Sequence, residues 1–170
     1  MTNLVSNTGV VGSDVTGVGT DREELTACEY GGDKGIFGLG TIPGNDVSMT
    51  NLVSNVGVVA DDVTGVATAR GVPAACGYGY DKGIFGFGND GGTAVSMTNL
   101  VSNAGVVASD TTGVGNARQY LAATQYGGDK GIFSFGNNDA TNLVSNVGVV
   151  ATDVTQVGTG RQGLAACSFN

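Results

Sequence analysis

The stretch Arg118-Gln119-Tyr120-Leu121-Ala122-Ala123-Thr124-Gln125-Tyr126 is followed by Gly127-Gly128-Asp129-Lys130 and then by Gly131-Ile132-Phe133-Ser134-Phe135. Two short runs rich in apolar, β-branched and aromatic residues thus flank a Gly-Asp-Lys-Gly corner. This is the pattern of a β-hairpin, and the last glycine of the corner is free to take a positive φ as a bulge residue. The stretch predicts paired strands and decides the fold class.

The same phrase is repeated along the chain, and all the basic residues lie on its frame. Four arginines begin the four copies at spacings of 48, 48 and 43 residues, namely Arg22, Arg70, Arg118 and Arg161. Each lysine lies 12 positions after one of the first three arginines, at Lys34, Lys82 and Lys130. Basic residues that recur in register are parts of a repeated unit, so we expect a repeat architecture.

Two further segments complete the unit. One is Thr98-Asn99-Leu100-Val101-Ser102-Asn103, with counterparts beginning at Thr2, Thr50 and Thr141. The other is a Val-Val-x-x-Asp-x-Thr stretch built around the recurring aspartates Asp14, Asp62, Asp110 and Asp153. The four segments are short, rich in β-branched or aromatic residues and separated by Gly or Asn, as strands are. Because no stretch shows a helical period with caps, we predict an all-β chain.

A period of about 48 residues with four strands per unit is typical of a β-propeller blade. We therefore predict a β-propeller of about four blades, in which the N- and C-terminal strands share the closing blade. A β-solenoid coil has a shorter period, and a β-sandwich has no reason to repeat its sequence this closely.

The motifs resemble the kelch repeat. In kelch blades an Arg precedes the first strand and an aromatic-plus-glycine phrase ends the second; the matching residues are Arg70, Ala74-Ala75 and Ile84-Phe85-Gly86-Phe87-Gly88. The resemblance covers nearly the whole chain, although the Gly-Gly doublet and the later Trp of kelch blades are missing. The segment 87–92 is also similar to propellers of the regulator-of-chromosome-condensation type. In style the near-identical repeats resemble those of tailed-phage and environmental virus proteins, a likeness that carries no site residues with it.

The repeat predicts a single propeller domain over residues 1–170. Whole blades are expected at 22–69, 70–117 and 118–160, and the closing blade combines 1–21 with 161–170. This closing blade lacks the Asp-Lys-Gly-Ile-Phe strand. It is either a shorter blade, or a blade that a second chain completes, or part of a longer array. The first alternative needs no partner, and an incomplete blade exposes strand edges that suit it for assembly.

The recurring arginines and aspartates are expected to be structural. Each aspartate lies eight residues before an arginine, as Asp62 lies before Arg70. We predict an Arg–carboxylate or Arg–carbonyl bond that ties the outer strand of one blade to the next blade. The functional alternative is a ring of arginines that binds an anion at one mouth of the channel. Repetition in every unit favours the structural role.

A second repeated set lies around the hairpin corners. It consists of Tyr30, Tyr78 and Tyr126 with Asp33, Asp81 and Asp129. Solvated turns and packing at the strand ends are the simplest interpretation. The alternative is a lectin-like module with one shallow pocket per blade, in which tyrosine faces stack on a sugar and carboxylates bind its hydroxyl groups. The acidic loops at 61–62, 89–90 and 137–139 lack the dense alternation of a calcium loop, so we predict no metal site.

The composition excludes several classes of function. A net charge of −8 argues against nucleic acid, whose phosphates require clustered Lys and Arg. The sequence has neither an apolar run of membrane-spanning length nor a secretory signal at its start, so we expect a soluble protein of a virion or the cytoplasm. The three cysteines form no close pair and are expected to be buried thiols. With no His and no nucleotide or nucleophile motif, we predict no cofactor and no catalysis.

These patterns together predict a non-catalytic structural or binding propeller module of a virion or another extracellular assembly, with the carbohydrate-binding propeller as the alternative. Its expected partner is the chain itself, through the incomplete blade, or another protein or glycan. Selective binding is expected where the units differ, at Asp21, Glu23, Glu24, Glu29, Tyr80, Tyr120 and loop 41–48.

Overall fold

A computed structural model describes residues 1–155 and 158–169 of the chain. Within these residues the protein is all-β and contains several small antiparallel sheets but no helix, which confirms the predicted class. The longer strands are β1 (Thr26–Tyr30), β2 (Lys34–Gly38), β5 (Thr50–Val53), β6 (Ala74–Tyr78), β7 (Lys82–Gly86), β10 (Thr98–Val101), β11 (Ala122–Tyr126), β12 (Lys130–Ser134) and β13 (Ala140–Val144). The two-residue strands are β3 (Thr41–Ile42), β4 (Asn45–Asp46), β8 (Asn89–Asp90), β9 (Thr93–Ala94) and β14 (Val154–Thr155).

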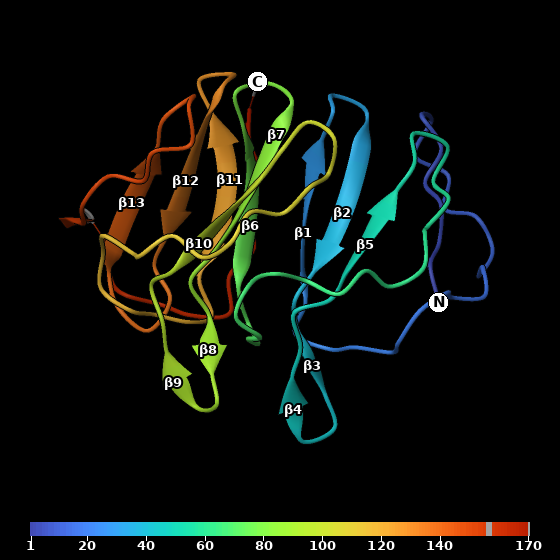
Figure 1. The fold of residues 1–170 in the computed structure, drawn as a ribbon. Coiled ribbons are helices and arrows are strands. Elements are labelled where there is room, and N and C mark those ends of the chain that lie inside the picture. Colours follow the sequence, from blue (N-terminus) through green and yellow to red (C-terminus); the bar gives the residue numbers. More distant parts are fainter. Residues whose placement is uncertain (156–157, 170) are drawn as a thin grey trace.

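The longer strands form three sheets of the same design, one in each of the units 22–69, 70–117 and 118–160 (Figure 1). Their orders are β1-β2-β5, β6-β7-β10 and β11-β12-β13-β14. The first two strands of each sheet close a hairpin in the same register, in which Tyr30 faces Lys34, Tyr78 faces Lys82 and Tyr126 faces Lys130. The fourth segment pairs through isolated bridges in the first two units and partly as β14 in the third.

The second strand of each unit ends one residue earlier than the sequence pattern predicts. Leu39, Phe87 and Phe135, expected as strand residues, adopt φ values of 62°, 61° and 61°. A non-glycine residue in this left-handed region is strained and persists only where its surroundings hold it. The strain turns the chain sharply, and the next residue is a glycine in each unit.

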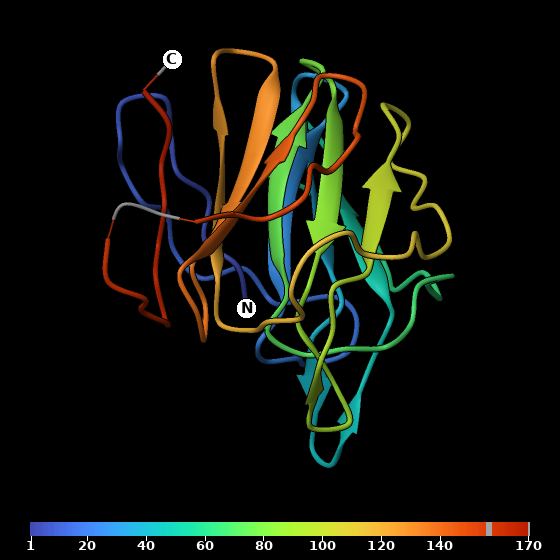
Figure 2. The same ribbon diagram turned by 90° about the vertical axis from the view of Figure 1, so that its left-hand side faces the viewer.

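The hydrophobic core lies between successive sheets. One cluster joins the first two units and includes Tyr30, Ile36 and Phe85; a second joins the last two units and includes Phe87 and Phe133. Figure 2 shows the strands of the neighbouring sheets running side by side. Each unit therefore buries its apolar face against its neighbours, as stacked repeats do.

Glycines allow the sheets to approach one another. A Cβ atom at Gly38 would lie 2.6 Å from the ring of Phe85 in the next unit, and one at Gly86 would lie 2.8 Å from the ring of Phe133. In the repeated Gly-aromatic motif, the aromatic ring of one sheet thus packs directly against a glycine of the preceding sheet.

The segments that precede and follow the three units lie apart. The N-terminal hairpin, residues 1–15, pairs with itself through bridges from Thr2 to Val15 and from Val5 to Val11. It stands at the right of Figure 1, whereas residues 161–169 run behind the middle of the molecule and contain no strand. The shared closing blade expected from 1–21 and 161–170 remains a prediction; residue 170 lies outside the described residues.

The close approach of the sheets predicts the effect of a single methyl group. Gly86→Ala should lower the free energy of unfolding by about 1–3 kcal/mol, because its Cβ displaces the buried Phe133 ring. Gly12→Ala is the control, since its Cβ would meet only the Leu4 carbonyl oxygen, at 3.5 Å. Urea unfolding measures both variants, and equal midpoints would contradict the role assigned to Gly86.

Candidate functional site

Each of the three units holds an arginine where its strands end. In the second unit the Arg70 side chain is 0% exposed. Its Nε donates a hydrogen bond to the carbonyl oxygen of Phe87 at 2.8 Å, and its Nη2 donates to Oδ1 of Asn99. Its Nη1 lies 3.6 Å from Oδ1 of Asp110. The guanidinium thereby joins the ends of the second, third and fourth segments of one sheet. Burial lowers the pKa of Arg70 to about 10, so the group stays protonated at neutral pH.

The aspartate of this cluster is itself held by hydrogen bonds. Asn99 Nδ2 donates to Asp110 Oδ1 at 2.9 Å and to the Ala108 carbonyl oxygen at 3.1 Å. The Thr68 hydroxyl donates to Asp110 Oδ2 at 2.6 Å, and the Thr68 amide donates to the same carboxylate. Partial desolvation raises the pKa of Asp110, but the hydrogen bonds from Thr68 and Asn99 and the charge of Arg70 outweigh it, so the pKa lies below its ordinary value.

We call this arrangement the strand-end cluster. It consists of a Thr or Asn, an Arg two residues later, an Asn and an Asp. Its complete copies are Thr20, Arg22, Asn51 and Asp62; Thr68, Arg70, Asn99 and Asp110; and Asn116, Arg118, Asn142 and Asp153. Asn51 and Asn142 were not singled out from the sequence, although they occupy one fixed position of the repeated Thr-Asn-Leu-Val segment.

The pairing of arginine with aspartate differs from the expected one. Asp62 does not bind Arg70, eight residues away; it lies beside Arg22, and Arg70 binds Asp110, 40 residues later. The reason is geometric, because the first and fourth segments of one unit meet at the same end of its sheet. The arginine–carboxylate bond therefore closes a unit on itself, while the same carboxylate accepts hydrogen bonds from Thr68 at the end of the preceding unit.

The arginine nevertheless also binds the preceding unit. The Arg118 guanidinium lies 4.2 Å from the ring centroid of Phe87, and the Gly88 amide donates to the Arg118 carbonyl oxygen at 3.0 Å. Gly40 makes the same backbone bond to Arg70. One residue type thus serves both the closure of its own sheet and the contact between sheets.

The aspartates and lysines of the hairpin corners are partly exposed. Asp81 and Lys82 form an ion pair at 2.7 Å, and Asn103 donates to Asp81 at 3.1 Å. The pairs Asp33–Lys34 and Asp129–Lys130 lie at equivalent corners, at 3.4 and 3.0 Å. The hydrogen bond from the neighbouring lysine lowers the pKa of Asp81 and of Asp129. These groups link the turns of one unit and face solvent.

Two of the three tyrosines are unavailable as stacking faces for a sugar. The side chains of Tyr30 and Tyr78 are only 4% and 3% exposed, which corrects their assignment as ligand-binding residues. The cause is packing between units, since Cβ atoms at Gly105 and Gly148 would lie 3.0 Å from the Tyr30 and Tyr78 rings. Tyr126 is half-buried.

The cysteines also differ from one another. Cys76 is buried, which raises the pKa of its thiol to about 12, and desolvation raises the pKa of Cys28 further. Cys167 is exposed, contrary to the expectation that all three thiols are buried. No segment of a following unit covers Cys167 among the described residues.

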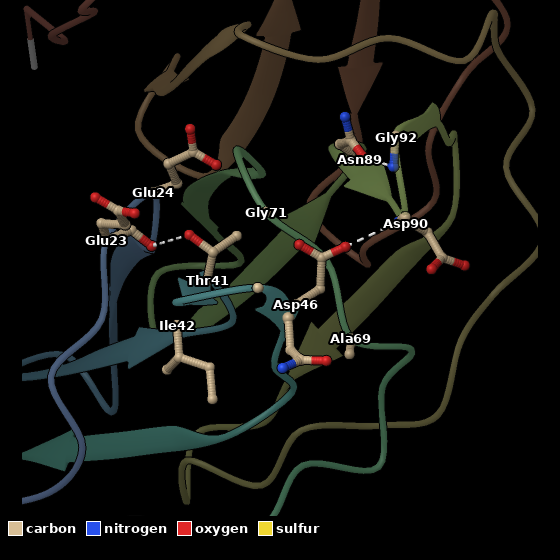
Figure 3. Close-up of a pocket in the computed structure, with 13 residues that line it drawn as sticks. Glu23, Glu24, Thr41, Ile42, Asp46, Ala69, Gly71, Asn89, Asp90 and Gly92 are labelled. Atoms are coloured by element: carbon tan, nitrogen blue, oxygen red, sulfur yellow. Dashed lines mark hydrogen bonds between the residues drawn. The ribbon is translucent and has the colours of Figure 1, made fainter.

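An open cleft lies where the units differ. The hairpins β3–β4 and β8–β9 extend together from the first and second units (Figure 1) and border this cleft of about 560 Å³. Figure 3 shows its carboxylates, contributed by Glu23, Glu24, Asp46 and Asp90. The Gly91 amide donates to Asp46 Oδ2 at 2.9 Å and links the two hairpins. Glu23, Glu24 and the loop 41–48 were expected from the sequence as places of selective binding.

A glycine opens this cleft. Gly71 follows Arg70 at the position where the other units carry Glu23, Gln119 and Gln162. A Cβ at Gly71 would lie 2.7 Å from Cγ2 of Thr41 and 3.0 Å from Oε2 of Glu24. The cleft is therefore specific to the junction of the first two units, and the third unit lacks the equivalent hairpin among its described residues.

Comparison with protein-family models and with curated proteins finds no match to this chain. Among the described residues no helix has the length and hydrophobicity required to cross a bilayer. The same residues contain no group of three or more His, Cys, Asp or Glu side chains placed to hold a metal ion.

The burial of Arg70 predicts a large effect of its removal. Arg70→Met should lower the free energy of unfolding by about 3–5 kcal/mol, because it leaves the buried Asn99 and Phe87 acceptors without a donor. Lys34→Met is the control, since this lysine is exposed and pairs at 3.4 Å only with the exposed Asp33, so its removal should change stability by about 0–1 kcal/mol. Urea unfolding of both variants measures the difference. An equal loss at the two sites would show that burial of the cluster contributes nothing.

The lowered pKa values of Asp62 and Asp110 predict sensitivity to acid. Because each pKa is lower in the folded state than in the unfolded chain, about 3.9, the stability contribution is complete above about pH 4 and is lost as the pH falls through the folded value. Thermal unfolding between pH 7 and pH 2 should show a steep decline below about pH 4. Asp110→Asn should make that decline shallower, whereas Asp139→Asn, in an exposed loop, should not.

Proposed function

We propose that the chain is a non-catalytic β-propeller module, kelch-like in its repeat, that binds another protein through the cleft between its two hairpins. The observation that carries this proposal is the contrast between the two kinds of surface. The contacts within and between units recur, whereas the 560 Å³ cleft is bordered by hairpins that the first two units have and the third lacks among its described residues. A virion or another extracellular assembly is the setting that we propose for such a scaffold.

Contacts across the molecule support a propeller-like arrangement. The first strands of the units, β1, β6 and β11, lie next to one another, and Gln125 of the third unit donates a hydrogen bond to Glu29 of the first. A Cβ at Gly77, the equivalent position of the second unit, would lie 2.8 Å from Glu29 Oε1. Contact between the first and third units across the second is what convergence of the inner strands on a common axis produces.

The titratable groups support a structural role for most of the charges. The arginines with lowered pKa values serve the strand-end clusters together with Asp62 and Asp110, whereas Asp81, Asp129 and the lysines serve the hairpin corners. A charged group that recurs in each unit and already bonds to neighbouring side chains is suited to stabilising the fold. Recognition of a partner then falls to the residues that are not repeated.

The lining of the cleft indicates the chemistry of the partner. The acidic residues Glu23, Glu24, Asp46 and Asp90 line the cleft together with Asn45 and Asn89. Asn89 is fixed by its hydrogen bond to Gln119 at 2.6 Å, so part of the wall is preorganised. Carboxylates bind amino and guanidinium groups through charge-assisted hydrogen bonds, and we therefore propose a basic segment of a protein as the ligand.

A peptide array tests this proposal. Labelled protein should bind peptides rich in Lys and Arg and not their Asp- and Glu-containing counterparts. The double variant Glu24→Gln, Asp46→Asn should weaken binding about tenfold, the effect of roughly 1.4 kcal/mol from two partly exposed ion pairs. Asp139→Asn is the matched control and should bind as the unchanged chain does. Equal binding by the double variant, or no binding to any basic peptide, would reject the cleft as the site.

The lectin-like propeller is the second candidate, and it now depends on one residue. Tyr126 is half-buried, lies four residues before Lys130, and is the only tyrosine of its set that is not buried. Binding to a defined sugar class on a glycan array, lost on Tyr126→Ala and retained by the cleft variant, would support this candidate over the proposed one.

A further inference from the structure

A fourth strand-end cluster is present in two separate halves. The complete clusters join a Thr or Asn and an Arg to an Asn and an Asp. Thr159 and Arg161 occupy the first two positions in the segment 158–169, and Asn3 and Asp14 occupy the last two in the N-terminal hairpin. The two halves lie in segments that stand apart in Figure 1, although they overlap in the view of Figure 2.

The acceptor half is already formed. Asn3 Nδ2 donates to Asp14 Oδ1 at 2.7 Å and to the Gly12 carbonyl oxygen at 3.2 Å. In the second unit Asn99 makes the same pair of bonds, to Asp110 and to Ala108. Among the described residues no guanidinium binds Asn3 or Asp14, whereas each of the equivalent pairs binds one.

The donor half is also in place. The Arg161 guanidinium lies 4.4 Å from the ring centroid of Phe135, as Arg118 lies 4.2 Å from that of Phe87. The Gly136 amide donates to the Arg161 carbonyl oxygen at 3.0 Å, which repeats the bond between Gly88 and Arg118. The arginine is therefore positioned on the third unit as its counterparts are positioned on theirs, but without the carboxylate and amide that bind them.

The apolar contacts between units are divided in the same way. At a complete junction a Leu and a Tyr of one unit pack against a glycine of the next unit, as Leu52 and Tyr30 pack against Gly105. At Gly57 the leucine contact is present, because a Cβ there would meet Leu4. The aromatic contact is missing: the residue that corresponds to Tyr30 in the repeat is Phe169, and it is 99% exposed. At Gly9 both contacts are missing, since nothing lies within 4 Å of a Cβ there. The side chains that the repeat would place against Gly9 are Tyr126, which is half-buried, and Leu143, which is 37% exposed.

We infer that a second copy of this chain brings the two halves together. The N-terminal hairpin of one copy packs against the segment 158–169 and the third unit of another, so that Arg161 binds Asn3 and Asp14. Within one copy the hairpin contacts the first unit, through Leu4 on Gly57, and the segment 158–169 contacts the third unit, through Arg161 on Phe135, but the two segments stand apart from each other (Figure 1). Charge and shape are complementary because the junction reproduces the contacts that each chain makes twice internally. Such a contact joins unlike surfaces, so it builds a ring or a filament.

Cys167 provides a direct measurement of this junction. In the complete junctions Cys28 packs on Gly83 of the next unit, and Cys76 packs on Gly131. Cys167 occupies the same position and is exposed, so the first unit of a second copy should cover it at Gly35. Maleimide labelling should therefore report Cys167 alone, because the other two thiols have raised pKa values and lie under neighbouring sheets.

The test combines labelling with light scattering over a range of concentrations. As the concentration rises, the labelling rate of Cys167 should fall at least about tenfold while the mean mass rises above that of one chain. Arg161→Glu and Asp14→Arg should each remain single chains with rapid labelling. An equimolar mixture of the two variants should recover assembly, because an unchanged Arg161 then meets an unchanged Asp14 across the junction between unlike chains. Asp90→Arg, at an exposed position of the second unit, is the control for a charge reversal outside the junction and should assemble normally.

Two results would overturn the inference. Rapid labelling and a single-chain mass at all concentrations would show that the halves do not meet. Slow labelling of a single chain at all concentrations, lost in Arg161→Glu, would show that they meet within one chain. Binding of basic peptides is measured separately on unassembled protein, so a failure of the cleft and a failure of this junction give different results.

Discussion

The arginine that each unit encloses is the interaction on which the rest of the structure depends. At Arg70 a charged group with no exposure is stable only because its donors find acceptors on the segments around it. Those acceptors lie 17 and 29 residues after Arg70, at the ends of two strands that pair with each other. A guanidinium presents its donors in a planar fork, so it holds several chain segments at fixed positions, which the single ammonium of a lysine cannot do. The register of the outer segments follows from this bond.

The same arginine explains two unusual features of the backbone. Phe87 adopts a positive φ at the end of β7, where its carbonyl oxygen accepts from Arg70. Its ring then lies under Arg118 and meets Phe133 edge-on, with centroids 5.2 Å apart. The strain of one residue is thus offset by a hydrogen bond in its own unit and by contacts with the next. Because the equivalent residues Leu39 and Phe135 share this conformation, the strain belongs to the repeat.

Repetition and its interruption divide the surface into two kinds. Where the contacts recur, side chains are already engaged with neighbours and serve the fold. The pattern is broken at two places. At the cleft a single residue, Gly71, differs from its counterparts, and in the fourth strand-end cluster the two halves are separated. Both proposals rest on that contrast. A repeat protein can present a specific site on a regular frame by altering a single position of one unit, since the frame does not depend on that position.

The sequence by itself determined the all-β class, the four-segment unit and the hairpin corners, because alternation, turn residues and repeat spacing are local properties of the chain. It also showed the period of the recurring arginines and aspartates, although not the part that the asparagines of the strand-end clusters play. Only the tertiary structure decided which aspartate each arginine binds, that Tyr30 and Tyr78 are covered, and that Glu23, Glu24, Asp46 and Asp90 border one cleft. These outcomes depend on which strand ends meet and on how closely one sheet approaches the next. Such distances are set by packing between residues far apart in the chain, which no local pattern encodes.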